Sequence, residues 1–190
     1  MIGLFGGSFD PVHHGHLIVG QVAAESLKLD SLRFVPAREQ PFKAGFHRTS
    51  AEHRAAMLEL ALRGMPHFAL ERSELDRSGP SYTVDTLRHL RERDPGTEFV
   101  LLLGADAAAD LPAWKEADAV ARLARIVVFG RPGFPVPAYP WVAGTVEVPA
   151  INISATEVRR RAGQRLSVRY WVPDAVAEYI ATHQLYLDPE

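Results

Sequence analysis

The sequence predicts an α/β protein built on an open parallel β-sheet. Short apolar runs alternate with longer stretches of helical periodicity along the 190 residues. Two runs, Glu98–Gly104 and Arg125–Gly130, lack the polar–apolar alternation of a half-exposed strand, as expected when both faces of a parallel sheet are covered. Repeated strand–helix alternation favours right-handed crossovers, with helices packed against the sheet.

The predicted strands are short and are often bounded by turn residues. About five of them are expected to form the parallel sheet of a three-layer fold, and one further short strand follows. In chain order the runs are Ile2–Phe5, Leu32–Pro36, His67–Glu71, Glu98–Gly104 and Arg125–Gly130, followed by Thr145–Val148.

The predicted helices lie between these strands. Residues 16–27 and 83–93 carry apolar side chains at helical spacing. Thr49 and Glu52 have the spacing of a capping box, which predicts a helix start ahead of the Ala- and Leu-rich stretch that follows. A last helix is expected near Pro173–His183.

Composition and charge exclude several classes of protein. Hydrophobic residues make up 47% of the chain and charged residues 23%, which is ordinary globular usage, and the net charge of −2 argues against a general nucleic-acid binder. The absence of cysteine excludes disulfides, thiolate nucleophiles and thiolate metal ligands. No signal peptide or membrane span is recognisable. We therefore expect one domain over residues 1–190 in the cytoplasm, with no nucleic-acid or membrane partner, and a homo-oligomer is compatible with the sequence.

The stretch GLFGGSFDPVHHGHL near the start predicts an anion site at a strand end. The strand runs into Gly6 and Gly7, whose bare backbone lets N–H groups approach a phosphate, and a helix start follows. His13 and His16 are three residues apart, so both imidazoles can face the same way. The glycine spacing matches neither the dinucleotide fingerprint nor the P-loop. A catalytic zinc would need a third protein ligand, so phosphate binding is the favoured interpretation.

A second stretch, ISATEVRRR, predicts a helix start that is also suited to an anion. Ser154 and Glu157 have the spacing of a capping box, which explains these residues on structural grounds alone. The same arrangement presents backbone N–H groups, the hydroxyls of Ser154 and Thr156, and Arg159 one turn later. The two interpretations are compatible, and from the residues alone they carry equal weight.

Together these stretches resemble the paired motifs of the nucleotidyltransferase superfamily. HHGH is similar to its H-x-G-H signature and ISATEVR to its I-S-S-T-x-x-R motif, with Ala155 where serine is usual. PSYTVDTL, LLGADAAADLPAW, VVFGRPG and the terminal YIATHQLY are similar, in this order, to the bacterial nicotinate mononucleotide adenylyltransferase family. PFK resembles that family's P-P-H-K loop, except that Gln40 and Phe42 replace proline and histidine. The resemblance implies a Rossmann-like three-layer fold with a small C-terminal helical part.

The resemblance also implies an activity in NAD biosynthesis: transfer of AMP from ATP to the 5′-phosphate of nicotinate mononucleotide, with release of pyrophosphate. The implied catalytic residues are His13, His16, Lys43 and Arg159. The implied ATP-binding residues are Gly6, Gly7, Ser8, Phe9, Gly104, Asp106, Ser154 and Thr156. Those implied for nicotinate mononucleotide are Tyr82, Thr83 and Trp114. A Mg²⁺ ion held mainly by substrate phosphates is expected, because the positive charges among the implied site residues are too few to balance about six negative charges on the substrates. No protein metal ligand is assigned.

Three of these residues have structural alternatives. Asp106 is equally suited to cap a helix, and Thr83 has the same alternative at the next helix start. An isolated Trp114 is more typical of a core than of a stacking platform. Arg160 and Arg161, beside Arg159, fit a solvated helix face.

Two other functions compete with the implied one. Within the superfamily, phosphopantetheine adenylyltransferase typically has threonine in place of His13 and lacks the SYTVDTL and Trp114 segments. A nucleotide-binding sensor without catalysis has less need to retain His13, His16 and Arg159 together. The sequence therefore favours the nicotinate enzyme over both.

Overall fold

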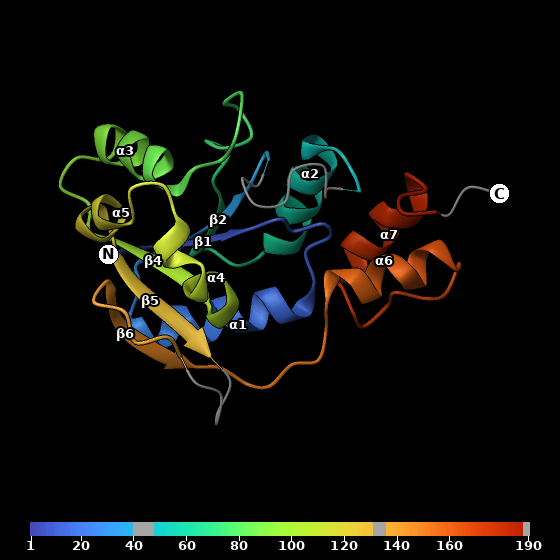
Figure 1. Ribbon diagram of the computed structural model, residues 1–190. Coiled ribbons are helices and arrows are strands. Elements are labelled where there is room, and N and C mark those ends of the chain that lie inside the picture. Colours follow the sequence, from blue (N-terminus) through green and yellow to red (C-terminus); the bar gives the residue numbers. More distant parts are fainter. Residues whose placement is uncertain (40–47, 131–135, 188–190) are drawn as a thin grey trace.

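The computed structural model describes residues 1–39, 48–130 and 136–187. Within these residues the chain forms a sheet of six parallel strands in the order β3-β2-β1-β4-β5-β6 (Figure 1). The strands are β1 (Ile2–Gly7), β2 (Ser31–Pro36), β3 (Phe68–Leu70), β4 (Phe99–Gly104), β5 (Arg125–Gly130) and β6 (Val142–Glu147). Because β1 and β4 are neighbours, the chain order reverses at the centre of the sheet.

Helices connect the strands, and the last two helices lie beyond the sheet at the right of Figure 1. They are α1 (His14–Leu27), α2 (Ala51–Leu62), α3 (Thr83–Arg93), α4 (Ala105–Ala109), the 3-10 helix η1 (Leu111–Ala113), α5 (Ala117–Leu123), α6 (Ala155–Gly163) and α7 (Asp174–Thr182). No helix in the described ranges combines the length and apolar character needed to cross a bilayer.

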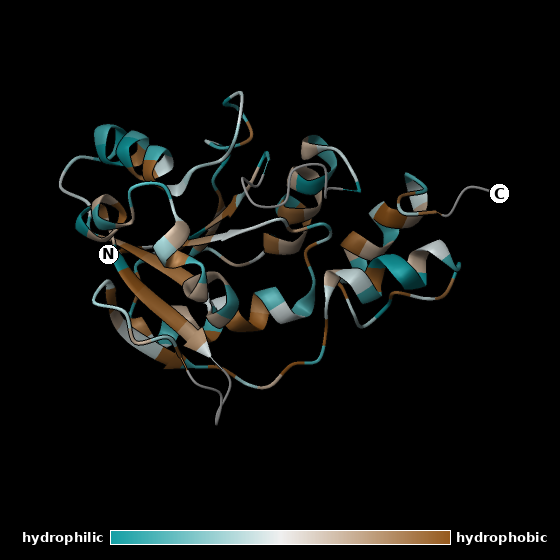
Figure 2. Cartoon of the chain, viewed as in Figure 1, coloured by the Kyte–Doolittle hydropathy of each residue, from teal (hydrophilic) through white to brown (hydrophobic). Residues whose placement is uncertain are grey.

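Two hydrophobic cores cover the two faces of the sheet, and the strands are accordingly among the most hydrophobic parts of the chain in Figure 2. Alternate residues of a strand point to opposite faces. In β4, Val100 and Leu102 join the core formed with α1, α2, α6 and α7, whereas Leu101 and Leu103 join the core formed with α3, α4 and α5. The continuous apolar run of β4 is therefore explained by burial on both sides.

The predicted fold class is confirmed, with differences in single elements. The sheet has six strands instead of about five, because Val142–Glu147 pairs with β5 as a parallel edge strand. The third strand covers only Phe68–Leu70. Thr49 is not the cap of α2, because the hydroxyl of Ser50 accepts the N–H of His53 at 3.2 Å and the helix begins at Ala51. The short helices between β4 and β5 were not predicted.

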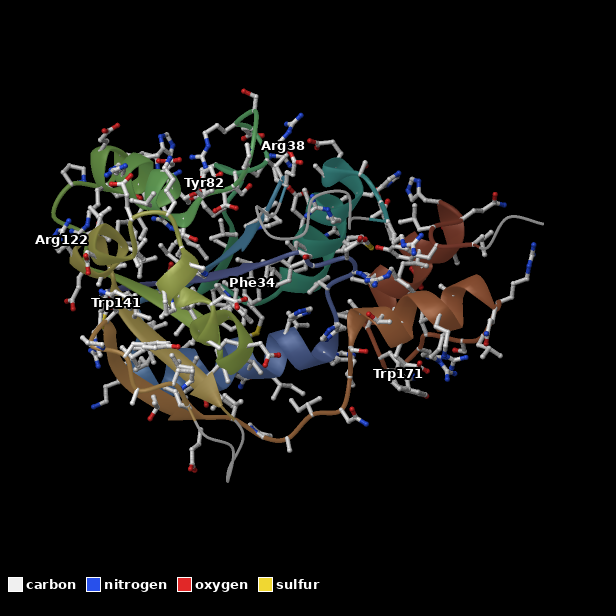
Figure 3. The ribbon with its side chains drawn as sticks, viewed as in Figure 1. Phe34, Arg38, Tyr82, Arg122, Trp141 and Trp171 are labelled. Atoms are coloured by element: carbon white, nitrogen blue, oxygen red, sulfur yellow. The ribbon has the colours of Figure 1, made fainter. Side chains whose placement is uncertain are left out.

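The C-terminal part of the chain is tied to the loop after β1. Arg159 Nη1 donates to the carbonyl oxygen of Asp10 at 2.7 Å, and the Tyr186 hydroxyl donates to Asp10 Oδ1 at 2.7 Å. The N–H of His14 donates to the carbonyl oxygen of Trp171 at 3.0 Å. Trp171 lies beside α6 in Figure 3. Burial and the neighbouring Asp10 raise the pKa of Tyr186 above its usual range, so its hydroxyl keeps its proton. These bonds place the second motif against the first.

Replacing Tyr186 with phenylalanine is expected to lower the free energy of unfolding by about 1–3 kcal/mol, because the carboxyl of Asp10, 2% exposed, loses a donor. Chemical denaturation at neutral pH measures the change. Tyr170→Phe is the matched control, since Tyr170 is 81% exposed, and we expect a change below about 0.5 kcal/mol. Equal effects of the two substitutions would contradict the anchoring role of Tyr186.

Candidate active site

A cleft of about 390 Å³ opens at the carboxyl ends of β1 and β4. Open α/β sheets commonly bind ligands at this position, where the strand order reverses. The cleft brings together seven residues predicted from the sequence: Gly6, Gly7, Tyr82, Thr83, Gly104, Asp106 and Trp114. The other described residues predicted for the site do not line this cleft: Ser8, Phe9, His13, His16, Ser154, Thr156 and Arg159.

The imidazoles of His13 and His16 stack on each other at the start of α1. Their ring centroids are 3.7 Å apart and their planes differ by 23°. His13 is the N-cap residue and His16 lies in the first turn, so the spacing of three does bring the two rings to the same side. The ring of Phe9 supports that of His16 with a centroid distance of 4.9 Å.

Both imidazoles are uncharged near pH 7. Burial, with a smaller contribution from the charge of His14, lowers the pKa of His13 to about 4. Burial and the neighbouring His13 hold the pKa of His16 well below its usual range. The backbone N–H of His13 donates to Nδ1 of His16 at 3.3 Å, and a neutral imidazole that accepts at Nδ1 carries its proton on Nε2. His16 is thus an Nε2–H donor, while Nδ1 of His13 has no partner in the part of the chain that is described.

Gly15 provides the space that the stacked pair occupies. A Cβ atom at this position would lie 3.0 Å from both Nδ1 and Cε1 of His13, and 3.6 Å from the carbonyl oxygen of Ile153. Any side chain at Gly15 would therefore press on the His13 ring, while its distance from the Ile153 oxygen is that of an ordinary contact. The nearness of Ile153 shows that the ISATEVRRR stretch lies against the start of α1.

The start of α6 carries the second predicted set of donors. The hydroxyl of Ser154 accepts the N–H of Glu157 at 3.2 Å, so the predicted cap is present. The Glu157 carboxylate bonds an arginine of its own helix, so only one half of the capping box forms. Arg159 donates to the carbonyl oxygen of Asp10 and, at 3.2 Å, to the hydroxyl of Thr156. The side chains of Ser154 and Thr156 are exposed.

The opposite end of the cleft is formed by the start of α3. Tyr82 is its N-cap and Thr83 its first residue, so the alternative role of Thr83 as a cap is wrong. Across the described residues, the N–H groups of Thr83 and Val84 have no acceptor, as expected for a first helical turn. Lys115, which the sequence analysis did not single out, places Nζ 4.7 Å from the centre of the Tyr82 ring and 3.0 Å from Asp85.

Three further predicted residues take specific positions around the cleft. Trp114 is partly buried, packs against the second core and lines the cleft, a position compatible with both a core role and a stacking role. Asp106 is exposed in the first turn of α4, whose N-cap is Gly104, so the alternative role of Asp106 as a cap is wrong. Phe9 is 1% exposed as a whole residue, so almost none of its surface is accessible.

A buried arginine beneath the glycine loop was not found from the sequence. Arg54 of α2 is 1% exposed, and it donates to the carbonyl oxygens of Ser8 at 2.8 Å and Arg38 at 3.5 Å. No local pattern separates it from a solvated helix charge, because its partners come from other elements. Lys43, with Gln40 and Phe42, lies outside the described residues.

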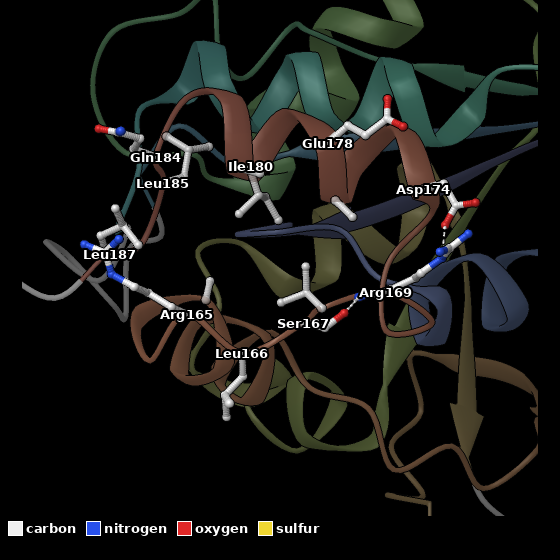
Figure 4. A pocket seen from close by; sticks show the side chains of 14 residues that line it. Arg165, Leu166, Ser167, Arg169, Asp174, Glu178, Ile180, Gln184, Leu185 and Leu187 are labelled. Carbon is white, nitrogen blue, oxygen red and sulfur yellow. Dashed lines mark hydrogen bonds and ion pairs between the residues drawn. The ribbon is translucent and has the colours of Figure 1, made fainter.

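A second hollow of about 550 Å³ lies between the end of α6 and α7, away from the sheet (Figure 4). Its apolar wall includes Leu166, Ile180 and Leu185, and Arg169 at its rim approaches Asp174 at 3.6 Å. None of the predicted site residues lines this hollow. The candidate active site is therefore the cleft at the strand ends.

Comparisons with known proteins agree on one family. Residues 4–161 match the family described as Cytidylyltransferase-like. The chain is 46% identical to a probable nicotinate-nucleotide adenylyltransferase of Thermomicrobium roseum, covering 97% of this chain and 91% of that protein. It is 48% identical to the protein of the same name from Thermus thermophilus, covering 97% and 98%. Plasmodium falciparum nicotinic acid mononucleotide adenylyltransferase complexed with NaAD shares the fold, with a TM-score of 0.80, 21% identity and coverage of 97% and 96%.

Replacing Gly15 with alanine is expected to displace the His13 ring and to lower kcat at least about tenfold, because a misplaced donor loses most of its effect on a reacting group. Steady-state kinetics and thermal melting are measured on the same preparation. Gly144→Ala in β6 is the control, since the atom nearest to its added Cβ would be 3.9 Å away. Unchanged turnover of folded Gly15→Ala would contradict the assigned role of Gly15.

Proposed function

The chain belongs to the cytidylyltransferase-like family and, within it, to the nicotinate-nucleotide adenylyltransferases, and from this premise we propose that it transfers AMP from ATP to the 5′-phosphate of nicotinate mononucleotide. The products are nicotinate adenine dinucleotide and pyrophosphate, and the reaction belongs to NAD biosynthesis. The observation that carries the proposal is the layout of the strand ends. The glycine loop at the end of β1 and the open start of α3 line one cleft. The stacked histidines follow the same loop at the start of α1, outside the lining of that cleft.

The reaction forms one P–O bond and breaks another. An oxygen of the mononucleotide phosphate attacks the α-phosphorus of ATP, and the bond from this phosphorus to the oxygen that bridges to the β-phosphate breaks. The attacking oxygen is already anionic, so the protein need not supply a general base. Its task is to align two polyanions and to stabilise the charge that develops as pyrophosphate leaves.

In the proposed mechanism, His16 donates its Nε2–H to the α-phosphate. The donor is held in place before substrate arrives, by the His13 N–H at Nδ1 and by the Phe9 ring beneath it, so it needs no reorganisation during the reaction. Arg159, Ser154 and Thr156 bind the phosphates that leave, next to the start of α6. Lys43 completes the set of proposed phosphate contacts, together with Gly6, Gly7 and Ser8.

Mg²⁺ fits this site as an ion that arrives with the substrate. Among the residues described, no group of three or more His, Cys, Asp or Glu side chains is arranged to hold a metal. Mg²⁺ commonly remains bound to substrate phosphates and water, where it neutralises charge on the transferring and leaving groups. The side chains of this protein would then bind the phosphates, and the phosphates would coordinate the metal.

The pyridine mononucleotide is proposed to occupy the other end of the cleft. Trp114 and Tyr82 flank the ring, and Asp106 accepts hydrogen bonds from ribose hydroxyls. The free N–H groups of Thr83 and Val84 favour a carboxylate on the ring, since a helix start carries partial positive charge. An amide would bring its own N–H donors toward these donors.

Pyrophosphate release is expected with ATP plus nicotinate mononucleotide, at a kcat/KM at least about tenfold above that with nicotinamide mononucleotide, because only the carboxylate gains charge-assisted hydrogen bonds. Phosphopantetheine, assayed in parallel, should give no product. Equal kcat/KM for the two mononucleotides would refute the assignment of the α3 start, and turnover of phosphopantetheine would favour the competing enzyme.

Replacing His16 with alanine is expected to lower kcat about a hundredfold or more while the Kd for ATP changes little, since an interaction that strengthens only in the transition state acts on kcat. Rapid-quench kinetics and isothermal titration measure the two quantities.

His14→Ala is the matched control for this substitution. Its side chain is partly exposed, and the hydrogen bond from His14 to Trp171 uses the backbone N–H, which alanine keeps. Near-normal turnover is expected. If folded His16→Ala also turned over normally, His16 would not be at the reacting phosphate.

A further inference from the structure

Glu74 is a buried carboxyl at the pyridine end of the cleft, and the proposed reaction does not use it. It follows β3, is 8% exposed and lines the cleft together with Ser81, Tyr82 and Thr83. A buried carboxyl without an ion pair is costly, so its retention beside a binding site calls for an explanation. No salt bridge to Glu74 occurs in the described part of the chain.

Glu74 joins two segments through a hydroxyl group. The Thr86 hydroxyl of α3 donates to Glu74 Oε1 at 2.7 Å, and Arg77 Nη2 approaches the same hydroxyl at 3.3 Å. Ser81 lines the cleft beside Glu74 and lowers the pKa of its carboxyl, and the Oγ of Ser81 accepts the N–H of Arg38 at 3.0 Å. Arg38 and the nearby start of α3 appear on the same side of the molecule in Figure 3. The carboxyl thus links the segment after β3 to the helix start that faces the substrate.

The charged groups around Glu74 leave it without a direct counterion. Glu71 is engaged with Arg93 at 2.6 Å and Arg33 at 3.6 Å, and Arg38 donates to the carbonyl oxygen of Leu75. Across the cleft the charged lining residues are Asp106, Asp110 and Lys115, and Lys115 is paired with Asp85 of α3. Burial raises the pKa of Glu74 to about 7, against the opposing effects of Thr86, Ser81 and Arg77.

We propose, on the basis of the proposed function, that Glu74 is a positioning and specificity residue for the pyridine mononucleotide. Its carboxyl fixes the start of α3 through the hydroxyl of Thr86, and its negative charge, when present, opposes the carboxylate of the substrate. The protonated form therefore favours the anionic ring. The ATP phosphates are little affected, because their proposed contacts His16, Ser154 and Arg159 do not line the cleft that Glu74 lines.

The sign of the pH effect follows from the raised pKa. Glu74 is neutral well below pH 7 and ionises above it, so the KM for nicotinate mononucleotide should rise on the alkaline side. Stability that depends on the neutral form is likewise lost as the pH rises through this value. Glu74→Gln keeps an acceptor for Thr86 and removes both effects.

The test compares the wild-type protein with Glu74→Gln at about pH 6 and about pH 8.5, on either side of the Glu74 pKa. The ratio of the wild-type KM to the variant KM for nicotinate mononucleotide should be near one at the lower pH. It should be about threefold or more at the higher pH, with the KM for ATP unchanged. This ratio cancels the titration of the substrate's own phosphate. The melting temperature of Glu74→Gln should rise relative to wild type over the same interval.

Glu74→Leu removes the hydrogen bond as well as the charge. Its KM for nicotinate mononucleotide should increase about tenfold at both pH values while kcat and the KM for ATP change less than about twofold. A pH-independent ratio for Glu74→Gln, or a parallel rise of both KM values in Glu74→Leu, would overturn the proposal while leaving the adenylyltransferase function intact. Absence of wild-type turnover with nicotinate mononucleotide would instead overturn the proposed function, and this inference with it.

Discussion

The stacked imidazoles of His13 and His16 are the arrangement on which the rest of the site depends. Two rings 3.7 Å apart cannot both be charged at low cost, and burial already lowers the pKa of each. The fold therefore presents a neutral Nε2–H donor on His16, whose ring is oriented by the backbone N–H of His13 and packs edge-to-face with the Phe9 ring. A neutral donor holds the ground-state polyanion less tightly than a cation would. More of its stabilisation is consequently reserved for charge that develops during transfer.

This arrangement requires parts of the chain that are far apart in sequence. The lack of a side chain at Gly15 leaves room for the His13 ring, and the carbonyl oxygen of Ile153 also lies near Gly15. Arg159 reaches the carbonyl oxygen of Asp10 across 149 residues, and Tyr186 bonds the Asp10 side chain. The C-terminal helices thus support the first loop directly. The two sequence motifs act together because the fold closes this long-range contact, in addition to placing the cleft at the strand ends.

The sequence was sufficient to predict the parallel sheet, the glycine loop and the capped start of α6, because each depends on a short pattern of apolar runs or spacing. Other features depend on tertiary contacts that leave no such pattern. Arg54 is indistinguishable from a surface charge until its carbonyl partners are known, and Glu74 has the same property. The short helices after β4 lie in an Ala-rich stretch too brief for periodicity to predict. The alternative role of Thr83 and Asp106 as helix caps was wrong, because they lie one and two residues past the actual N-caps, Tyr82 and Gly104.

The protonation state of His16 is the central claim, and nitrogen NMR of protein labelled with ¹⁵N-histidine tests it most directly. The two ring nitrogens of a neutral Nε2–H imidazole have well-separated shifts, whereas those of an imidazolium are similar. We predict a single neutral Nε2–H tautomer for His16 at about pH 7, because burial holds its pKa well below the usual range of histidine. His14 serves as an internal reference in the same spectra. A His16 ring that is protonated at neutral pH, or that carries its proton on Nδ1, would contradict the account.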